Sequence, residues 1–450
     1  MITGFSILNL WKERNYRIEF SDGNLIIVGE NGCGKTTVLR ILYYVLSKKW
    51  VLLADEDFEA IELISDKDVP LRINSNDFVG LDDYVVDVES ILERELPPYY
   101  YKKIIQYCGE YATPEQVYRA LEVNSIPDTA ATRIRNWIER KGKKLPINLK
   151  KADKWIERNN PYPILYLPTY RRSERYNSFD SSMEGQIRRH RGFDSVIYDV
   201  EVAKEGMRDV AETIQQRISD IKLEYDKTSS ELNIKCFKGI LNREYNSITK
   251  IKEEYMNPDD ISVIFNSVSS KDVFLENIDQ IKNKLLELLS KTETYDEYDK
   301  IVTYYYNMLI ERYEYLKKME EPLEAFFFAC NKYLTAKKIE YRPNEFRYEV
   351  ILDRRDCEEK YTIDLNHLSS GEKQLVSLFS YVYLSISSKC MIIIDEPELS
   401  LSVDWQTSIL EDVIKSKKCG SLIAATQSPF VYDNSLVSVA RSLDSFLTLE

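Results

Sequence analysis

The chain has 450 residues and a net charge of −13, from 61 basic and 74 acidic side chains. This length supports two or three packed units, and the acidic balance argues against a surface that attracts nucleic acid everywhere. Seven scattered cysteines include no C-x-x-C pair, so we expect neither a zinc site nor a disulfide framework. Without a signal peptide or an apolar run near the ~18 residues of a membrane span, we expect a soluble, cytoplasmic protein that does not enter a membrane.

The N-terminal segment predicts a small β layer around one loop. Alternating apolar side chains over residues 2–9 and 16–20 predict an antiparallel hairpin. The apolar run at 25–28 predicts a buried strand, and residues 57–64 and 69–73 predict two further strands. We expect these strands to lie beside whatever the loop after residue 28 binds.

The loop after the strand at 25–28 carries a nucleotide-binding pattern. Its sequence, Gly-Glu-Asn-Gly-Cys-Gly-Lys-Thr-Thr, fits G-x-x-x-x-G-K-T and leads into an apolar helix over 38–45. Backbone N–H groups of such a loop surround phosphates, and the helix N-terminus adds roughly half a positive charge. The alternative is a chance match in a glycine-bearing turn, and the flanking strand and helix argue against it. The residues expected to bind nucleotide are Gly29, Asn31, Gly32, Cys33, Gly34, Lys35, Thr36 and Thr37.

A helical region interrupts the α/β pattern after residue 80. Its amphipathic segments are separated by Pro, Gly and Asn. They cover residues 84–95, 99–110, 114–123, 130–141 and 150–159. A region of roughly 80 residues can own a modest core, so we expect a helical insertion over residues 81–160.

An apolar strand returns at 163–168 and ends in an arginine-bearing loop, where ligand-facing groups of an α/β sheet usually lie. Three interpretations of the arginines stay open: a solvated or internally paired face, a phosphate contact by Arg171 or Arg172, and a docking surface for nucleic acid or an acidic partner. The cluster comprises Arg171, Arg172, Arg175, Arg188, Arg189 and Arg191.

Residues 196–340 are predicted to be mostly helical. The longest periodic stretches are 203–232, 273–290 and 297–336. No heptad pattern is sustained over many turns, so we expect a compact helical lobe in place of a long coiled coil.

The C-terminal part predicts a hairpin and then a glycine turn that opens a helix. The strands of the hairpin are expected at 347–352 and 359–363. The sequence Leu-Ser-Ser-Gly-Glu-Lys-Gln at 368–374 precedes a helix over 374–386. Taken alone, such a turn is a helix cap in which a serine accepts from the first free N–H groups.

Two carboxylates end the next apolar strand. Asp395 is expected to hold the Mg²⁺ that the Thr36 hydroxyl also contacts, while Lys35 reaches the β and γ phosphates. Glu396 is expected to polarise the attacking water. A solvated turn is the alternative for an isolated acidic pair, but the P-loop upstream and a further strand at 421–425 argue against it.

Five stretches resemble, in order and spacing, the Walker A, signature, Walker B, D-loop and switch segments of ABC-type ATPases. They are residues 29–36, 368–374, 392–396, 398–402 and 424–430. The resemblance is closest to the SMC/RecF/OLD branch, in the compact form of the ATPase subunits of bacterial anti-phage systems such as Septu and PARIS. Residues 165–172 and 206–210 also resemble sequence segments of those ATPases.

The resemblance implies an α/β fold: an ABC-type P-loop ATPase head, a mixed sheet with an antiparallel β layer, and helical insertions forming a compact helical lobe. It implies ATP and Mg²⁺ as cofactors and hydrolysis with Glu396 as a catalytic residue. Ser369 and Gly371 of one subunit would contact the γ-phosphate held by Lys35 of another, so ATP would hold a homodimer or a higher oligomer together.

The sequence departs from the family at the switch position. This residue is usually histidine, and here it is Gln427. Glutamine can hydrogen-bond a phosphate or a water but cannot carry a charge. We therefore expect Gln427 to support slow hydrolysis, or the protein to serve mainly as an ATP-held clamp.

Two functions remain open at this stage. In the first, the protein is the sensor and scaffold of an anti-phage complex and controls a separate effector, expected to be a nuclease because no nuclease centre is recognised in this chain. In the second, it is a RecF-like repair or recombination ATPase that acts on DNA directly. The acidic composition and the absence of a long heptad pattern favour the first, with nucleic acid or a phage component as further candidate partners.

This interpretation divides the chain into five segments. They are 1–80, the N-terminal lobe of the ATPase head with the P-loop; 81–160, the helical insertion; 161–195, the strand and Arg-rich loop of the head; 196–340, the helical lobe; and 341–450, the C-terminal lobe with signature, Walker B and switch.

Overall fold

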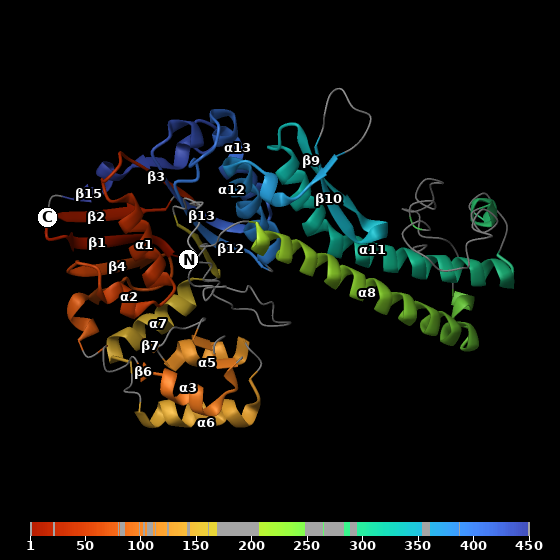
Figure 1. Ribbon diagram of the computed structural model, residues 1–450, viewed down its shortest axis with the longest axis horizontal. Coiled ribbons are helices and arrows are strands. Elements are labelled where there is room, and N and C mark those ends of the chain that lie inside the picture. The colour runs from red at the N-terminus through yellow and green to blue at the C-terminus, as the bar shows by residue number, and fades with distance from the viewer. Residues whose placement is uncertain are drawn as a thin grey trace. The chain divides into compact units, whose positions relative to one another are not determined.

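The computed structural model, drawn in Figure 1, groups the chain into two compact units. The first unit joins Met1–Asp209 with Ser385–Glu450, and the second is Val210–Leu384. The five-segment division given above stays a prediction. The structure describes residues 2–20, 23–79, 81, 86–98, 100–101, 104–105, 111–112, 114–123, 126–141, 145–160, 162–168, 207–247, 264, 283–288, 295–352, 361–386 and 388–448.

The first unit contains an antiparallel sheet with the strand order β15-β2-β1-β4-β5. Its strands are β1 (Ile2–Leu10), β2 (Arg14–Glu19), β4 (Ala60–Ser65), β5 (Leu71–Asn74) and β15 (Leu447–Thr448). The predicted hairpin is confirmed as β1 and β2, with Phe5 opposite Ile18. The edge strand β15, which places Leu447 opposite Tyr16, was not predicted because two residues carry no periodicity.

A second sheet in this unit is parallel throughout, in the order β14-β3-β13-β12-β8. Its strands are β3 (Leu25–Val28), β8 (Ile164–Leu167), β12 (Cys390–Asp395), β13 (Cys419–Thr426) and β14 (Ala440–Ser442). Every residue of β12 is buried, as expected for a strand covered on both faces. Because parallel strands end at one edge, the loops after β3, β12 and β13 share that edge.

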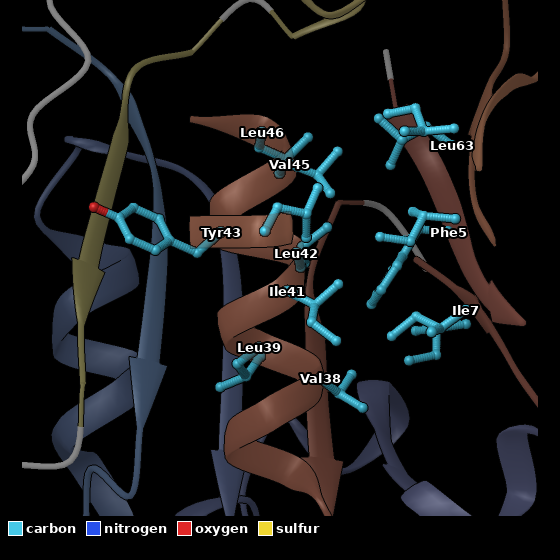
Figure 2. Packing of buried hydrophobic residues seen from close by; sticks show 14 of the residues in the cluster. Phe5, Ile7, Val38, Leu39, Ile41, Leu42, Tyr43, Val45, Leu46 and Leu63 are labelled. Carbon is cyan, nitrogen blue, oxygen red and sulfur yellow. The ribbon is translucent and has the colours of Figure 1, made fainter. Parts of the chain in front are cut away.

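The helix α1 (Lys35–Leu46) is apolar on two sides and packs against both sheets. Figure 2 shows Phe5 and Leu63 of the antiparallel sheet on one side of α1 and Tyr43 pointing to the other. There Tyr43 stacks on Tyr166 of β8 with ring centroids 4.4 Å apart. Each large apolar side chain fully buried here contributes about 1.5–3 kcal/mol. The helix that begins at the P-loop is therefore fixed on two faces.

Part of the predicted insertion has its own core, formed by residues between 88 and 138. Its elements are β6 (Val86–Asp87), α3 (Glu89–Glu95), β7 (Tyr111–Ala112), α5 (Pro114–Val123) and α6 (Asp128–Lys141). The helix predicted over 84–95 is wrong at its start, because Val86 and Asp87 pair with β7. The β-branched residues there favour a strand. Most of the helix predicted over 99–110 lies outside the described residues.

The last helix of the predicted insertion, α7 (Ile147–Asn159), packs elsewhere. Its Leu149 and Ile156 belong to the same apolar cluster as Phe5 of β1. The indole N–H of Trp50 donates to the Asp153 carboxylate of α7 at 2.9 Å. Further helices in the described part of this unit include α2 (Trp50–Ala54), η1 (Ser75–Phe78), α13 (Val403–Lys415), η8 (Pro429–Val431), η9 (Val437–Val439) and η10 (Leu443–Phe446).

Two long helices of the second unit are α8 (Arg208–Leu241) and α11 (Glu297–Asn331). They run antiparallel, because Gly239 lies against Tyr304 whereas Arg312 donates to Thr228 at 3.2 Å. At 1.5 Å per residue each helix is about 50 Å long. The two described helices therefore form a long antiparallel pair, and the compact helical lobe expected over residues 196–340 stays a prediction. Leu232 of α8 and Leu309 of α11 belong to one buried apolar cluster, so apolar packing joins the two helices in addition to the polar contact of Arg312.

A three-stranded antiparallel sheet follows these helices, in the order β11-β10-β9. Its strands are β9 (Lys337–Arg342), β10 (Arg347–Leu352) and β11 (Tyr361–Ile363). The predicted hairpin is confirmed as β10 and β11. Strand β9 was not predicted, since its sequence is mostly charged; the Asn331 side chain accepts from the Ile339 N–H at 2.7 Å and donates to the Ile339 carbonyl at 2.8 Å.

Further helical elements in the described part of this unit include η2 (Glu244–Ser247), η5 (Pro343–Glu345), η6 (Leu365–His367), α12 (Ser370–Phe379) and the π-helical turn Ser380–Ser385. The helix predicted over 374–386 therefore begins earlier, at Ser370. Among the described helices of either unit, none is long and apolar enough to cross a membrane.

Candidate functional site

Two glycines of the P-loop hold backbone conformations that other residues rarely adopt. Gly32 has φ +79° and Gly34, the N-cap of α1, has φ +105°. A side chain at Gly34 would approach the Trp11 ring to 3.1 Å, and one at Gly29 would meet the Cys33 sulfur at 2.7 Å. The loop is thus wound tightly around the N-terminus of α1, the geometry in which backbone N–H groups bind phosphate.

Lys35 is the first residue of α1 and its side chain turns back into this loop. The residue is only 5% exposed. Its ammonium group donates to the carbonyl oxygens of Gly29 at 2.7 Å and Glu30 at 2.8 Å. Because the lysine stem is flexible, the same ammonium group can exchange these carbonyls for phosphate oxygens without a change in the backbone.

Thr36 and Asp395 meet at the carboxyl edge of the parallel sheet. The Thr36 hydroxyl donates to the Asp395 carboxylate at 2.8 Å, although 359 positions separate the two residues in the chain. Asp395 ends β12 and is 3% exposed. Hydroxyl and carboxylate oxygens are ligands that suit Mg²⁺, which takes its other ligands from water and phosphate. These two residues therefore fit the magnesium site expected from the sequence.

Tyr166 lies near this pair, on the strand next to β12. Burial first, and then the charge of Asp395, raises the pKa of Tyr166 well above its ordinary value. The phenol therefore stays neutral at physiological pH. It adds no second anion next to Asp395.

Glu396 holds a strained backbone conformation directly after β12. Its φ is +48°, in the left-handed region, and its N–H donates to the Ala425 carbonyl of β13 at 2.8 Å. For a residue with a side chain this conformation costs on the order of 1–3 kcal/mol, and such strain concentrates at functional sites. The residue is half-buried and directly follows Asp395 in the chain. Its position is compatible with the catalytic role expected from the sequence.

Gln427 follows the end of β13 and is exposed. Its backbone N–H donates to the Glu398 carboxylate at 2.9 Å, and so does that of Ser428 at 3.3 Å. Glu398 is 9% exposed and fixes the loop that presents Gln427. The sequence named Glu398 only as the start of the D-loop stretch. Its position three residues after Asp395 could have indicated that Glu398 also lies at this edge of the sheet and supports the loop there.

We expect Gln427→His to raise the rate of ATP hydrolysis several-fold, which is part of the ~10²–10⁴-fold effect that a fully positioned proton-transfer group contributes. The substitution restores a side chain that can carry a charge, on a backbone that Glu398 already holds. Steady-state phosphate release measures the effect. An unchanged or lower rate would show that the loss of charge at this position is not what limits turnover.

Two residues beside the P-loop were missed by the sequence interpretation. Trp11 is 37% exposed, and its ring lies against Gly34. The backbone N–H of Trp11 donates to the Asp57 carbonyl at 2.9 Å. The Arg14 guanidinium donates to the Cys33 carbonyl at 3.1 Å. Trp11 lies in the turn between β1 and β2, and Arg14 is the first residue of β2. No motif marks them, because only the tertiary fold brings this turn to the loop.

The signature turn belongs to the second unit. Ser369 is exposed and is the N-cap of α12, where its hydroxyl accepts from the Glu372 N–H at 3.4 Å. The helix-cap interpretation of this turn is therefore confirmed. Gly371 lies in the first turn of α12 and is buried. The contact of both residues with a γ-phosphate stays a prediction, and the arginine cluster of 171–191 lies outside the described residues.

The structure brings five of the predicted site residues to one edge of the parallel sheet. They are Lys35, Thr36, Asp395, Glu396 and Gln427. A glycine-rich loop before a helix, a buried lysine and a threonine–aspartate pair define a P-loop nucleotide-binding protein of the α/β class.

A family model described as "AAA ATPase domain" matches residues 1–431. The chain belongs to this family. The match spans both compact units, and it agrees with the nucleotide-binding class that the P-loop and the Thr36–Asp395 pair define.

Two solved structures of Smc heads are similar to this chain. One is the SmcHead bound to the C-winged helix domain of ScpA, at 12% identity over 96% of this chain and 90% of that chain, with a TM-score of 0.34. The other is an Smc head domain with an extended coiled coil, bound to the C-terminal domain of ScpA from Pyrococcus furiosus, at 14% identity over 96% and 90%, also with a TM-score of 0.34. No curated protein sequence matches the chain.

Proposed function

We propose that this chain hydrolyses ATP with Mg²⁺ at the carboxyl edge of its parallel sheet. The observation that carries the proposal is the hydrogen bond of 2.8 Å between Thr36 and Asp395. It joins the two Mg²⁺ ligands that the P-loop and the acidic strand each supply from opposite ends of the chain. The family match over residues 1–431 supports the same activity.

Each residue of the site has a separate task in this proposal. Lys35 binds the β and γ phosphates, and Thr36 and Asp395 hold Mg²⁺, which neutralises the charge that develops on the phosphates. Glu396 accepts a proton from the attacking water. Gln427 hydrogen-bonds that water or the γ-phosphate but does not change charge.

We also propose that two copies close around ATP and that the dimer controls a separate effector, a nuclease, in anti-phage defence. The motif resemblance supports dimerisation, since Ser369 and Gly371 correspond to residues that act across subunits. The resemblance of residues 165–172 and 206–210 to segments of anti-phage ATPases supports the defence role. A RecF-like role on DNA is the competing function.

Cells carrying the gene with its neighbours provide the test. We expect the wild-type locus to lower the plating of some phages and the Lys35→Ala locus to lose that effect, because the effector is controlled through ATP. A neighbouring nuclease gene is expected. Strong stimulation of the purified ATPase by gapped DNA, with no change in phage plating, would instead support the RecF-like function.

A further inference from the structure

A buried carboxylate lies directly behind the signature turn. Glu372, in the first turn of α12, is 4% exposed. One of its oxygens accepts from the Ser369 N–H at 2.7 Å. The same oxygen accepts from the ammonium group of Lys337 at 2.7 Å. Lys337 is the first residue of β9, so the signature turn is tied to a different element by an ion pair.

The charge of this pair bears on what the turn can bind. A helix N-terminus carries roughly half a positive charge, which is what would attract a phosphate to Ser369. A lone Glu372 carboxylate adds a full negative charge at the same helix end and would outweigh that half charge. Lys337 cancels the carboxylate and leaves the helix end positive. The pair is mostly shielded from water, so salt screens it little.

Lys337 is itself held in place. Both backbone groups of Ile339, two residues further along β9, bond to the Asn331 side chain at the end of α11. The Tyr333 ring, between α11 and β9, packs on Phe379 of α12 with centroids 5.5 Å apart. Burial opposes ionisation of Glu372, but the hydrogen bonds from Lys337 and Ser369 outweigh it and lower the pKa of the carboxyl. Glu372 is therefore charged at neutral pH, and Lys337 has a charge to compensate.

We propose that Lys337 is a positioning residue of the composite ATP site. By neutralising Glu372, it keeps the turn from Ser369 to Gly371 oriented and positive for the γ-phosphate held by a second copy of the chain. The inference rests on the proposed function, because it requires the signature turn to act across the dimer.

The test uses a 1:1 mixture of two inactive chains. The P-loop-dead chain carries Lys35→Ala, and the signature-dead chain carries Ser369→Arg. Their heterodimer has one intact composite site, which combines the P-loop of the signature-dead chain with the signature of the P-loop-dead chain. Lys337→Met, which keeps the length of the stem and removes the charge, is then placed on one chain at a time.

On the P-loop-dead chain, which supplies the working signature, Lys337→Met is expected to lower the recovered ATPase rate roughly tenfold or more. On the signature-dead chain the same change should leave the recovered rate as it was. The asymmetry separates a role in the signature from a folding defect, because a misfolded chain would lower the rate in either position. Equal loss on both chains, or no loss on either, overturns the proposal.

Two further variants sharpen the result. Adding Glu372→Gln to Lys337→Met removes the uncompensated charge, and glutamine can still accept from the Ser369 N–H, so most of the lost rate should return. Lys338→Met is the matched control, because Lys338 is the next residue of β9 and its side chain is 62% exposed. If the parental mixture recovers no activity although a mixture of Lys35→Ala with the wild type is active, the composite site of the proposed function fails. That outcome differs from recovery without asymmetry.

Discussion

Replacing Lys35 by alanine is expected to abolish ATP binding. The ammonium group of Lys35 is buried within the P-loop, where it donates to the carbonyls of Gly29 and Glu30. Its loss removes the cation that neutralises the β and γ phosphates, and helix and loop dipoles alone do not replace a full charge. Calorimetric titration with Mg²⁺ and ATP should detect no binding at concentrations that saturate the wild-type protein.

Two comparison variants separate this effect from others. Lys154→Ala removes an exposed lysine of α7 in the same unit and should bind ATP as the wild type does. Glu396→Gln should also bind ATP, but turnover should fall by about 10²–10⁴-fold because the amide cannot accept a proton from water. ATP binding by the Lys35→Ala protein at wild-type affinity would contradict the role of Lys35. Hydrolysis by Glu396→Gln at the wild-type rate would show that Glu396 is not the base.

The P-loop and the strand before it could be predicted from sequence because their signals are local. Four apolar residues, three glycines and a helix that begins at Lys35 occupy a continuous stretch, and each piece constrains the next. The acidic strand ending at Asp395 was predictable for the same reason, since a buried parallel strand is a run of apolar residues.

The contacts between distant segments could not be derived from local patterns. The P-loop motif predicted that Thr36 and Asp395 share a metal, but the arrangement that joins them depends on β13 lying between β3 and β12. Trp11 reaches the P-loop only because the β1–β2 turn packs there. The positive φ of Glu396 is a property of the backbone, and the residue type does not predict it.

In the second unit the long helices were predicted from their periodicity, but one strand was not. Helices α8 and α11 share a buried apolar cluster that includes Leu232 and Leu309, and Arg312 also donates to Thr228. Strand β9 was not predicted, because its sequence is mostly charged and shows no clear alternation of apolar and polar side chains; the charged residues include Lys337, Lys338 and Glu340. The capping interpretation of the signature turn succeeded because Ser369 and Glu372 have the spacing of a capping box.

A 1:1 mixture of the inactive Lys35→Ala and Ser369→Arg proteins is expected to regain ATPase activity. Lys35→Ala destroys the P-loop, and Ser369→Arg blocks the signature turn with a bulky planar group at an exposed position. In a heterodimer both defects fall on one composite site and the other site is intact. If subunits pair at random and sites act independently, the mixture should show about a quarter of the wild-type rate.

The ATPase rate of this mixture, measured after subunit exchange has been verified with labelled chains, tests most directly whether the site forms between two copies. The predicted result is that the mixture of the two inactive proteins recovers part of the wild-type ATPase rate. Mixing Lys35→Ala with the wild type serves as the reference, because it shows whether a dimer with one working site turns over. If that reference dimer is active while the mixture of Lys35→Ala and Ser369→Arg stays silent, the signature turn acts within its own chain and the composite site is contradicted.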